Sequence, residues 1–376
     1  MVELGTLAVN STLPMPSVDP AVDALAIARL WRADETECVP PLIQAAELDD
    51  VRRERTALVT RRLIEGMRRH ESPRGLEAIT AAFPLNSPAG LALLSLAEAL
   101  LRVPDAGNAD RLVRDRLSRV DWNQYRSSGA LGTALRLASA CVSGPGSAVT
   151  RSSARGWRSL TTPLVRTAMQ FAIRSLSDQF IFGHSIQAAL ARAGRGAGRA
   201  YRYSFDMLGE AALTAHDAQR YFQAYRQAIH AVGGAYRGQG PLAGGSVSVK
   251  LSALHPRYGY TQHDRIMREL LPRLFELARL AQQYDIALVI DAEEADRLAP
   301  SLDLIQALMC APDLADWGGL GVAVQAYQKR APAVIDYLLQ LSAQRRARLL
   351  VRLVKGAYWD SEIKWTQMDG LAGYPV

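Results

Sequence analysis

The chain has 376 residues, a formal net charge of +7 and 49% hydrophobic residues. This length and apolar content suit two or three packed domains and exclude a chain that is disordered throughout. The cysteines Cys38, Cys141 and Cys310 form no CxxC pair, which excludes a cysteine zinc site and favours a reducing compartment. No uncharged run reaches the roughly 18 residues of a membrane span, and no signal peptide is readable.

The first two hundred residues predict a helical region. Leucine and alanine recur at helical spacing, and β-branched runs are scarce. The clearest helical segments are 21–31, 58–67 and 90–101. Pro40-Pro41 is expected to separate helices, and the stretch 143–147 is expected to be a loop at a domain boundary. The stretch RAGRGAG (192–198) is similar to a dinucleotide fingerprint, but no strand precedes it, so we interpret it as a flexible linker.

Positive charge is concentrated in the middle of the chain. Residues 101–200 hold fifteen arginines against five acidic residues. Such a block is typical of nucleic-acid binding, but these arginines are dispersed at near-helical spacing and are not interleaved with aromatic residues. We therefore interpret the block as a solvated helical face and expect no nucleic-acid partner.

After residue 200, short apolar runs alternate with amphipathic segments. The predicted strands are 201–206, 246–250, 286–291, 320–325 and 349–354, and the predicted helices are 215–232, 264–284, 300–310 and 331–346. Strand starts lie about 30 to 45 residues apart, the length of a βα unit. Repeated βα units imply parallel strands joined by right-handed crossovers. Because no glycine-rich turn follows the first strand, a (β/α)₈ barrel is favoured over a dinucleotide-binding fold.

Each predicted strand ends in a polar or charged residue, which is where barrel enzymes place their working side chains. These residues are Asp206, Lys250, Asp291, Gln325, and Arg352 followed by Lys355. Alternation along the strands puts Lys250 on one face with Ser246 and Ser248. Structural explanations compete at each position, since a strand-end aspartate often caps a loop and a buried lysine often pairs with an aspartate. Arg352, inside the apolar run LLVRLV, is expected to need a carboxylate or a ligand as its partner.

Lysine is scarce in this chain. Only four of the 44 basic residues are lysines: Lys250, Lys329, Lys355 and Lys364. Where arginine is the default cation, each remaining lysine is a candidate for a role that needs a compact ammonium group. The histidines have no metal-ligand spacing and no GxSxG motif is present, so neither a metal site nor a serine hydrolase is predicted.

Five stretches carry a resemblance to a known family. They are YSFDMLGEAALT, VKLSALHPRY, YDIALVIDAEEADRL, VQAYQKRAP and RLVKGAYWDSEIKWTQMDGLAGYPV. In this order they closely resemble the proline dehydrogenase domain of the bacterial PutA family of bifunctional proline-catabolic flavoenzymes. The resemblance is strong over 201–376 and weaker over 24–200.

The resemblance implies a distorted (β/α)₈ barrel that holds non-covalent FAD. It implies an N-terminal arm (1–60), a helical domain (61–200) and the first part of the barrel (201–376). In this family L-proline is oxidised to Δ1-pyrroline-5-carboxylate as a hydride passes from proline C5 to flavin N5, and the electrons then pass to quinone. The resemblance also implies a cytoplasmic protein that associates peripherally with the membrane during turnover, and it leaves the oligomeric state open.

The family pattern assigns roles to individual residues. Arg352 matches the arginine beside flavin N5, Lys250 matches the lysine that binds the substrate carboxylate, and Asp206 lines the substrate side. Tyr358 offers a ring with a polar tip near the substrate. The flavin contacts implied by the resemblance are Asp291, Ala292, Gln325, Arg352, Val354, Lys355, Gly356, Ala357, Tyr358 and Trp359.

The sequence departs from the family pattern in two respects. Its first twenty residues do not resemble the DNA-binding ribbon-helix-helix segment of the repressor members, so autogenous repression is not expected. Only five strands are counted where the family barrel has eight, and no aldehyde dehydrogenase domain follows. With both sheet edges open, we expect this chain alone to be an inactive fragment.

Two alternative functions remain open from the residues. One is an aldolase-type barrel enzyme that forms a Schiff base through Lys250 or Lys355. The other is a non-enzymatic regulatory protein that binds nucleic acid through residues 101–200. Bound flavin would favour the oxidoreductase, borohydride trapping on Lys250 the aldolase, and salt-sensitive DNA binding the regulatory protein.

Overall fold

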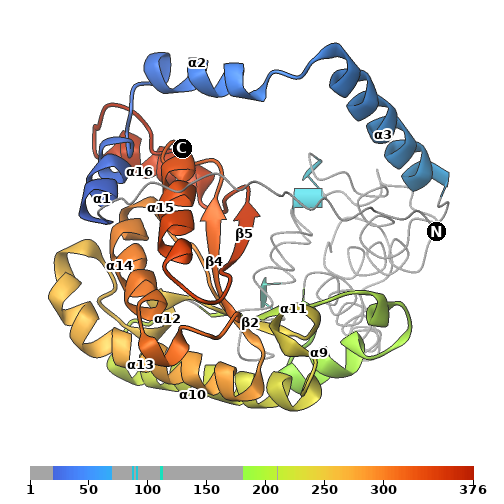
Figure 1. Cartoon of the computed structure of the whole chain (residues 1–376), viewed down its shortest axis with the longest axis vertical. Coiled ribbons are helices and arrows are strands. Elements are labelled where there is room, and N and C mark those ends of the chain that lie inside the picture. Colours follow the sequence, from blue (N-terminus) through green and yellow to red (C-terminus); the bar gives the residue numbers. More distant parts are fainter. Residues whose placement is uncertain (1–19, 70–86, 89, 92–110, 113–180, 210) are drawn as a thin grey trace, which may run out of the picture. The chain divides into compact units, whose positions relative to one another are not determined.

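The structure is a computed structural model, and it describes residues 20–69, 87–88, 90–91, 111–112, 181–209 and 211–376. The chain divides into two compact units, of which the first joins Met1–Glu47 to Ala189–Val376 and the second is Leu48–Ala188. The first unit contains the whole described sheet (Figure 1). In the second unit the longest described element is helix α3 (Asp50–Arg69).

Five parallel strands form the sheet in the order of the chain, β1-β2-β3-β4-β5. They are β1 (Ser204–Asp206), β2 (Ser246–Val249), β3 (Ala287–Ile290), β4 (Leu320–Gln325) and β5 (Leu350–Val354). Strand β3 is buried on both faces, which explains its uninterrupted apolar sequence ALVI. Because all five strands run the same way, their carboxyl ends meet at one edge of the sheet.

Helices connect the strands and cover one face of the sheet (Figure 1). They are α10 (Ala215–Ala235), α11 (Gly240–Ala243), α12 (Leu251–Leu254), α13 (His263–Tyr284), α14 (Leu298–Met309) and α15 (Ala331–Ala343), and a further helix, α16 (Trp359–Met368), follows the last strand. A capping box between Thr214 and Asp217 begins α10, and α13 ends at Asp285, which takes a left-handed conformation. The core lies between the strands and these helices, where apolar side chains such as Val247, Leu288 and Leu274 are fully buried.

The predicted strands are all confirmed, with small differences at their ends. Strand β1 begins at Ser204 instead of residue 201, because residues 196–200 form a 3₁₀ turn and three residues of irregular backbone connect it to the strand. The flexible linker predicted at RAGRGAG is therefore wrong. Arg199 Nε donates to the Gly194 carbonyl at 2.7 Å and the Tyr203 hydroxyl donates to the Gly198 carbonyl at 2.9 Å, which fixes this turn.

The prediction that Pro40-Pro41 separates helices is also wrong. Both prolines lie inside helix α2 (Glu35–Ala46), whose N-cap Asp34 accepts a hydrogen bond from the Thr36 N–H. Proline has a helical φ, and the carbonyls that lose a partner here lie on an exposed helix where water can satisfy them. The predicted segments 21–31 and 58–67 correspond to α1 (Pro20–Arg29) and part of α3, whereas most of 90–101 and all of 143–147 lie outside the described residues.

The N-terminal segment is attached to the sheet unit. Helix α1 packs on α15, and the segment that follows it binds the loop after β4. Lys329 Nζ donates to the Ala33 carbonyl at 3.0 Å and pairs with Glu35 at 3.2 Å. The guanidinium of Arg330, which is 3% exposed, lies 5.2 Å from the centre of the Trp31 ring. This attachment gives one of the four lysines a structural role that the sequence did not predict.

The five strands form an open sheet in the part of the chain that the structure describes. Strand β1 pairs only with β2 there, and β5 pairs only with β4. Val351 and Leu353 on β5 are 47% and 61% exposed, because no described strand or helix covers this edge. The parallel sheet and the N-terminal helices agree with the predicted fold, while closure into a barrel is not observed. Within the described residues, no helix is long and apolar enough to span a membrane.

Candidate active site

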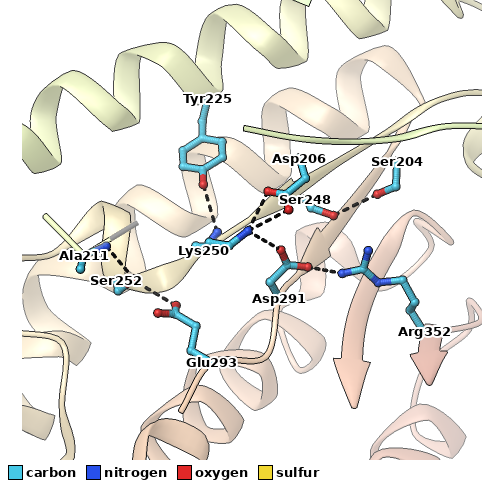
Figure 2. A network of polar contacts seen from close by, with 10 residues as sticks. All are labelled: Ser204, Asp206, Ala211, Tyr225, Ser248, Lys250, Ser252, Asp291, Glu293 and Arg352. Carbon is cyan, nitrogen blue, oxygen red and sulfur yellow. Dashed lines mark hydrogen bonds and ion pairs between the residues drawn. The ribbon is translucent and has the colours of Figure 1, made fainter. Parts of the chain in front are cut away.

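Lys250 lies at the carboxyl end of β2 with its ammonium group between two carboxylates. Its Nζ atom donates to both oxygens of Asp206, at 2.7 and 2.9 Å, and to Oδ2 of Asp291 at 3.1 Å. The side chains of Lys250 and Asp291 are 16% and 8% exposed, whereas that of Asp206 is 45% exposed. Strands β1, β2 and β3 are adjacent, so their ends bring these three predicted residues together (Figure 2).

Arg352 extends this cluster from β5. Its guanidinium donates to Oδ1 of Asp291, so one buried carboxylate binds the lysine through one oxygen and the arginine through the other (Figure 2). The predicted need of Arg352 for a carboxylate is therefore met. The Arg352 side chain itself is 44% exposed on the open edge strand. Asp206, Lys250, Asp291 and Arg352 form a chain of alternating charges, which we call the charge network.

The charge network keeps Lys250 protonated. Burial alone would lower the pKa of Lys250, but the hydrogen bond that Lys250 donates to Asp206 and the negative charges of both aspartates outweigh burial and raise the pKa above its usual value. Lys250 is thus a fixed ammonium group at neutral pH. This state suits the binding of an anion and is unsuited to nucleophilic attack, which needs a neutral amine.

Small polar side chains lie next to the charge network on the face predicted from strand alternation. The hydroxyls of Ser204 on β1 and Ser248 on β2 are 2.9 Å apart, and Ser248 is fully buried (Figure 2). Farther along the sheet on the same face, Gly321 has its backbone close to Val289, where an added Cβ would lie 3.0 Å from a methyl group. Because these side chains are small or absent, they project little from the centre of this face, next to the charged groups.

Glu293 holds together the loops next to the charge network, and no sequence pattern singled it out. Its Oε1 atom accepts the Ser252 N–H at 2.9 Å, and its Oε2 atom accepts from Arg297 at 2.8 Å. Ser252 in turn accepts the Ala211 N–H at 3.0 Å, which ties the loop after β1 to the loop after β3 (Figure 2). The only sequence signal that favours Glu293 over Glu294 is its position two residues after Asp291, because residues two apart in an extended chain point to the same side.

Gln325, predicted to contact a cofactor, is used within the chain. Its side-chain nitrogen donates to the Glu293 carbonyl at 2.7 Å, and its side-chain oxygen accepts the Ala357 N–H at 3.2 Å. It therefore connects the loop after β3 with the loop after β5. The second of these loops contains the predicted contacts Lys355, Gly356, Ala357 and Tyr358, and Trp359 begins the helix that follows it. Lys355, Ala357 and Trp359 are exposed. Of the remaining predicted contacts, Asp291 and Ala292 follow β3, and Arg352 and Val354 lie on β5.

A glycine and a tyrosine shape the loop after β5. Gly356 has φ +124°, and a Cβ added there would lie 2.4 Å from the Tyr327 ring. The Tyr327 hydroxyl accepts the Tyr358 N–H at 3.2 Å, and its ring lies 5.8 Å from that of Trp359. Tyr358 is thus brought to this edge through its backbone. Tyr327 was missed by the sequence analysis, since an aromatic residue after a strand carries no signal of this contact.

Comparisons with known proteins identify the family to which this chain belongs. A family model described as "Proline dehydrogenase" matches residues 189–376, which is the half of the chain that contains the sheet. The chain belongs to the proline dehydrogenase family. The model "Proline utilization A proline dehydrogenase N-terminal domain" matches residues 25–68, and the model "DNA-binding domain of Proline dehydrogenase" matches residues 75–180.

Curated members of the proline dehydrogenase family match most of the chain. "Bifunctional protein PutA" of Klebsiella aerogenes is 47% identical over 367 residues, which are 95% of this chain and 28% of that protein. The PutA protein of Escherichia coli is 46% identical over the same shares of both chains. "Proline dehydrogenase 1" of Bacillus subtilis is 25% identical over 198 residues, or 53% of this chain and 58% of that protein. The chain thus spans little more than a quarter of the PutA proteins that it matches.

A solved structure from the proline dehydrogenase family supports the fold. The crystal structure of a variant of Bradyrhizobium japonicum Proline Utilization A is 43% identical, with a TM-score of 0.66, and the match covers 92% of this chain and 35% of that one. The PutA resemblance inferred from the five sequence stretches is confirmed.

The family matches conflict with one expectation. The spacing of the arginines predicts no nucleic-acid partner, but the family model that matches residues 75–180 is described as a DNA-binding domain. The expectation rested on the spacing of arginines in residues 101–200, and spacing is weak evidence because helical packing can gather dispersed residues on one surface.

The residues at the carboxyl end of β5 fit the flavin nucleotide expected for this family. Arg352 and Lys355 supply cations that suit an anionic nucleotide, and Trp359 presents a ring that is 47% exposed. Gly356 lets the loop follow a path that no side chain could fit, since Tyr327 fills the space of its Cβ. The positions at which the family pattern places flavin contacts therefore lie on β5, in the loop that follows it up to the start of α16, and at the carboxyl ends of β3 and β4.

Proposed function

We propose that this chain provides the proline-binding part of an FAD-dependent proline dehydrogenase. The reaction is the oxidation of L-proline to Δ1-pyrroline-5-carboxylate, in which a hydride leaves C5 and a proton leaves the ring nitrogen. The observation that carries the proposal is the Lys250 ammonium, held between Asp206 and Asp291 next to Arg352. A fixed cation beside an exposed carboxylate is complementary to an amino acid, which carries both charges.

Each member of the charge network has a part in this proposal. Lys250 binds the proline carboxylate, which takes over hydrogen bonds that Asp206 accepts from Lys250 in the structure. Asp206 is the exchangeable partner because it is 45% exposed, whereas Asp291 is buried and keeps both Lys250 and Arg352 in place. Asp206 then lies on the substrate side, close enough to interact with the positively charged ring nitrogen.

FAD, when bound, supplies the hydride acceptor that no amino-acid side chain provides. The residues proposed to hold it are those of the family pattern: Asp291, Ala292, Gln325, Arg352, Val354, Lys355, Gly356, Ala357, Tyr358 and Trp359. Arg352 places a positive charge where negative charge increases during the oxidation. Because Gln325 is already bound on two sides, we propose that it acts mainly by holding the loop after β5.

Lys250 and Lys364 allow a direct test of the proposal. A protein of the length of the PutA relatives that contains this chain, which we call the complete polypeptide, is expected to reduce an artificial electron acceptor only when L-proline is present. Lys250→Met should raise the KM for proline by roughly a hundredfold, because a charge-assisted hydrogen bond is lost. Lys364→Met removes an exposed lysine on α16 and should change nothing. Equal effects of the two substitutions would contradict the assignment of Lys250.

The aldolase alternative is disfavoured by the raised pKa of Lys250. A Schiff-base lysine needs a lowered pKa, and this one is stabilised as an ammonium group by two carboxylates. Borohydride reduction in the presence of aldehyde or ketone substrates is expected to attach nothing to Lys250. Covalent trapping there would support the aldolase.

Turnover by this chain alone is not expected. Val351 and Leu353 are exposed, and within the described residues β1 and β5 each pair on one side only, so nothing described covers these two edges of the sheet. Transfer of electrons to quinone, peripheral membrane association during turnover and a cytoplasmic location belong to the same proposal and rest on the family resemblance. Robust proline-dependent dye reduction by the 376-residue chain alone would contradict this expectation.

A second candidate function is DNA binding through the middle of the chain. It is favoured by the match of residues 75–180 to the DNA-binding family model and by the fifteen arginines against five acidic residues in 101–200. Binding of duplex DNA by the complete polypeptide should then weaken steeply as salt rises, because counterions are released from the phosphates. No binding even at low salt would exclude this function.

A further inference from the structure

The backbone N–H of Lys250 lies beyond the hydrogen-bond ladder of the sheet. Pairing between β1 and β2 ends at Asp206 and Ser248, and pairing between β2 and β3 ends at Val249 and Ile290. Lys250 comes next, as the N-cap of the short helix α12, with φ −94° and ψ 123°. An N–H in this position must find a partner outside the ladder, because an unpaired backbone donor in a protein interior is costly.

Tyr225 on α10 provides that partner. Its hydroxyl accepts the Lys250 N–H at 3.1 Å, and the whole residue is buried with 0% exposure (Figure 2). Helix α10 packs directly on β2 and α12, so the ring is held against the backbone that it contacts. Helical spacing with Phe222 and Ile229 marks Tyr225 in the sequence only as a core residue, and the hydroxyl contact becomes visible in the fold.

The chemical state of Tyr225 suits a neutral hydrogen-bond acceptor. Burial, the largest influence, raises the pKa of Tyr225 above its usual value, and the negative charges of Asp206 and Asp291 raise it further. The Lys250 N–H and ammonium act in the opposite direction but do not outweigh burial. The hydroxyl therefore remains protonated and adds no third negative charge beside the two aspartates.

We propose that Tyr225 is a positioning residue for substrate binding, which fixes the backbone of Lys250 so that its ammonium meets the proline carboxylate at a defined point. The proposal rests on the proposed function of Lys250. The long lysine side chain has several rotatable bonds, so the position of its end depends on an anchored backbone and on its two carboxylates. Once substrate replaces Asp206, the backbone anchor and Asp291 are what remain to orient the ammonium.

Tyr225→Phe tests this role, with Tyr337→Phe as the matched control. Phenylalanine keeps the buried ring and removes only the oxygen atom that accepts the Lys250 N–H. Tyr337 on α15 is also buried, at 3% exposure, and its hydroxyl donates to Gln306 at 3.0 Å, a residue outside the charge network. Both variants lose one buried hydroxyl, so a general loss of stability should affect them alike.

The first readout is the kinetics of the complete polypeptide loaded with FAD. Tyr225→Phe should raise the KM for L-proline about tenfold and change kcat by less than about twofold, since a binding contact and not a transition-state contact is disturbed. Tyr337→Phe should leave both constants within about twofold of the wild type. An unchanged KM in Tyr225→Phe, or an equal rise in both variants, would overturn the proposal.

The second readout is hydrogen exchange resolved to single amides, which needs no activity. The Lys250 amide should exchange slowly in the wild type and much faster in Tyr225→Phe, but not in Tyr337→Phe. Fast exchange of this amide in the wild type would overturn the proposal even if Tyr225→Phe did not fold. If the wild type failed to oxidise proline, the proposed function would be wrong, and exchange alone would decide whether Tyr225 holds Lys250.

Discussion

At the scale of single residues, the polar positions at the strand ends are the most informative feature of the chain. Asp206, Lys250, Asp291 and Arg352 come from four strands and form one connected charge network. Their convergence could be predicted because parallel strands end at the same edge of a sheet. The partners of each residue could not, since the sequence does not say which carboxylate faces which cation.

The residues whose roles could not be predicted from the sequence were missed for one common reason. Glu293, Ser252 and Tyr225 act through contacts between segments far apart in the chain, and their local patterns are those of an ordinary loop or core helix. Lysine scarcity singled out Lys250, which lies in the charge network, but it did not distinguish Lys250 from Lys329, which binds the N-terminal segment.

Arg352 allows a prediction about electrostatic stabilisation. Arg352→Met should lower kcat for proline oxidation in the complete polypeptide by about 10²- to 10³-fold, because a cation next to the reacting groups is removed. Arg352→Lys keeps the charge and should recover part of the rate, although its single ammonium cannot reproduce the guanidinium geometry. Steady-state kinetics measure both, and a kcat in Arg352→Met equal to that of the wild type would contradict the role of Arg352.

Glu362 gives a prediction about pH. This buried glutamate on α16 accepts the Ala295 N–H at 2.7 Å. Burial, the largest influence, raises the pKa of Glu362, and the hydrogen bond from Ala295 and the charges of Arg330 and Arg32 offset this only in part. The folded protein therefore holds the Glu362 proton more tightly than the unfolded chain does. As a result, the folded protein becomes less stable as the pH rises from the ordinary pKa of glutamate through the raised pKa.

Denaturant unfolding at several pH values tests this sign. Relative to wild type, Glu362→Gln should become more stable as the pH rises through that range, since glutamine keeps the acceptor without the charge. Glu269 is the opposite case: hydrogen bonds from Arg265 and then His255 lower the pKa of Glu269. Glu269→Gln should therefore lose stability relative to wild type as the pH rises from the lowered pKa to the ordinary one. The same pH trend in both variants would contradict the assignment.

At the scale of elements, the loops after β4 and β5 form one supporting structure. The Ala326 and Tyr327 N–H groups donate to the carbonyls of Val354 and Lys355, at 2.7 and 3.0 Å, and extend the pairing of the two strands. The sequence predicted both strands and the importance of the loop after β5. It could not predict that Gly356 is required by the Tyr327 ring, because that contact depends on how β4 and β5 pair.

Gly356→Ala tests the shape of this loop. The substitution combines an unfavourable φ with a collision against the Tyr327 ring, so it should destabilise the protein by about 1–3 kcal/mol and weaken FAD binding. Gly370→Ala is the control, since Gly370 also has a positive φ, of +62°, but has open space where the Cβ would lie. Thermal unfolding and flavin titration measure both effects, and normal FAD affinity in Gly356→Ala would contradict the supporting role of the loop.

At the scale of the whole molecule, the order of the helices and strands after residue 200 could be predicted from the sequence. The apolar runs and their spacing gave the five parallel strands, because burial between helices leaves a clear mark on composition. The predicted domain boundaries at residues 60 and 200 stay predictions. Compact units instead join Met1–Glu47 to Ala189–Val376, through contacts such as that of α1 with α15, which no local pattern reveals.

Reduction of bound FAD by L-proline is the measurement that tests the central claim most directly. In the complete polypeptide without oxygen or quinone, L-proline should bleach the visible flavin absorbance in the wild type. Lys250→Met should require a far higher proline concentration for the same bleaching, and Lys364→Met should match the wild type. A protein that binds no flavin, or a flavin that proline reduces equally well without Lys250, would contradict the account of the charge network as a proline-oxidation site.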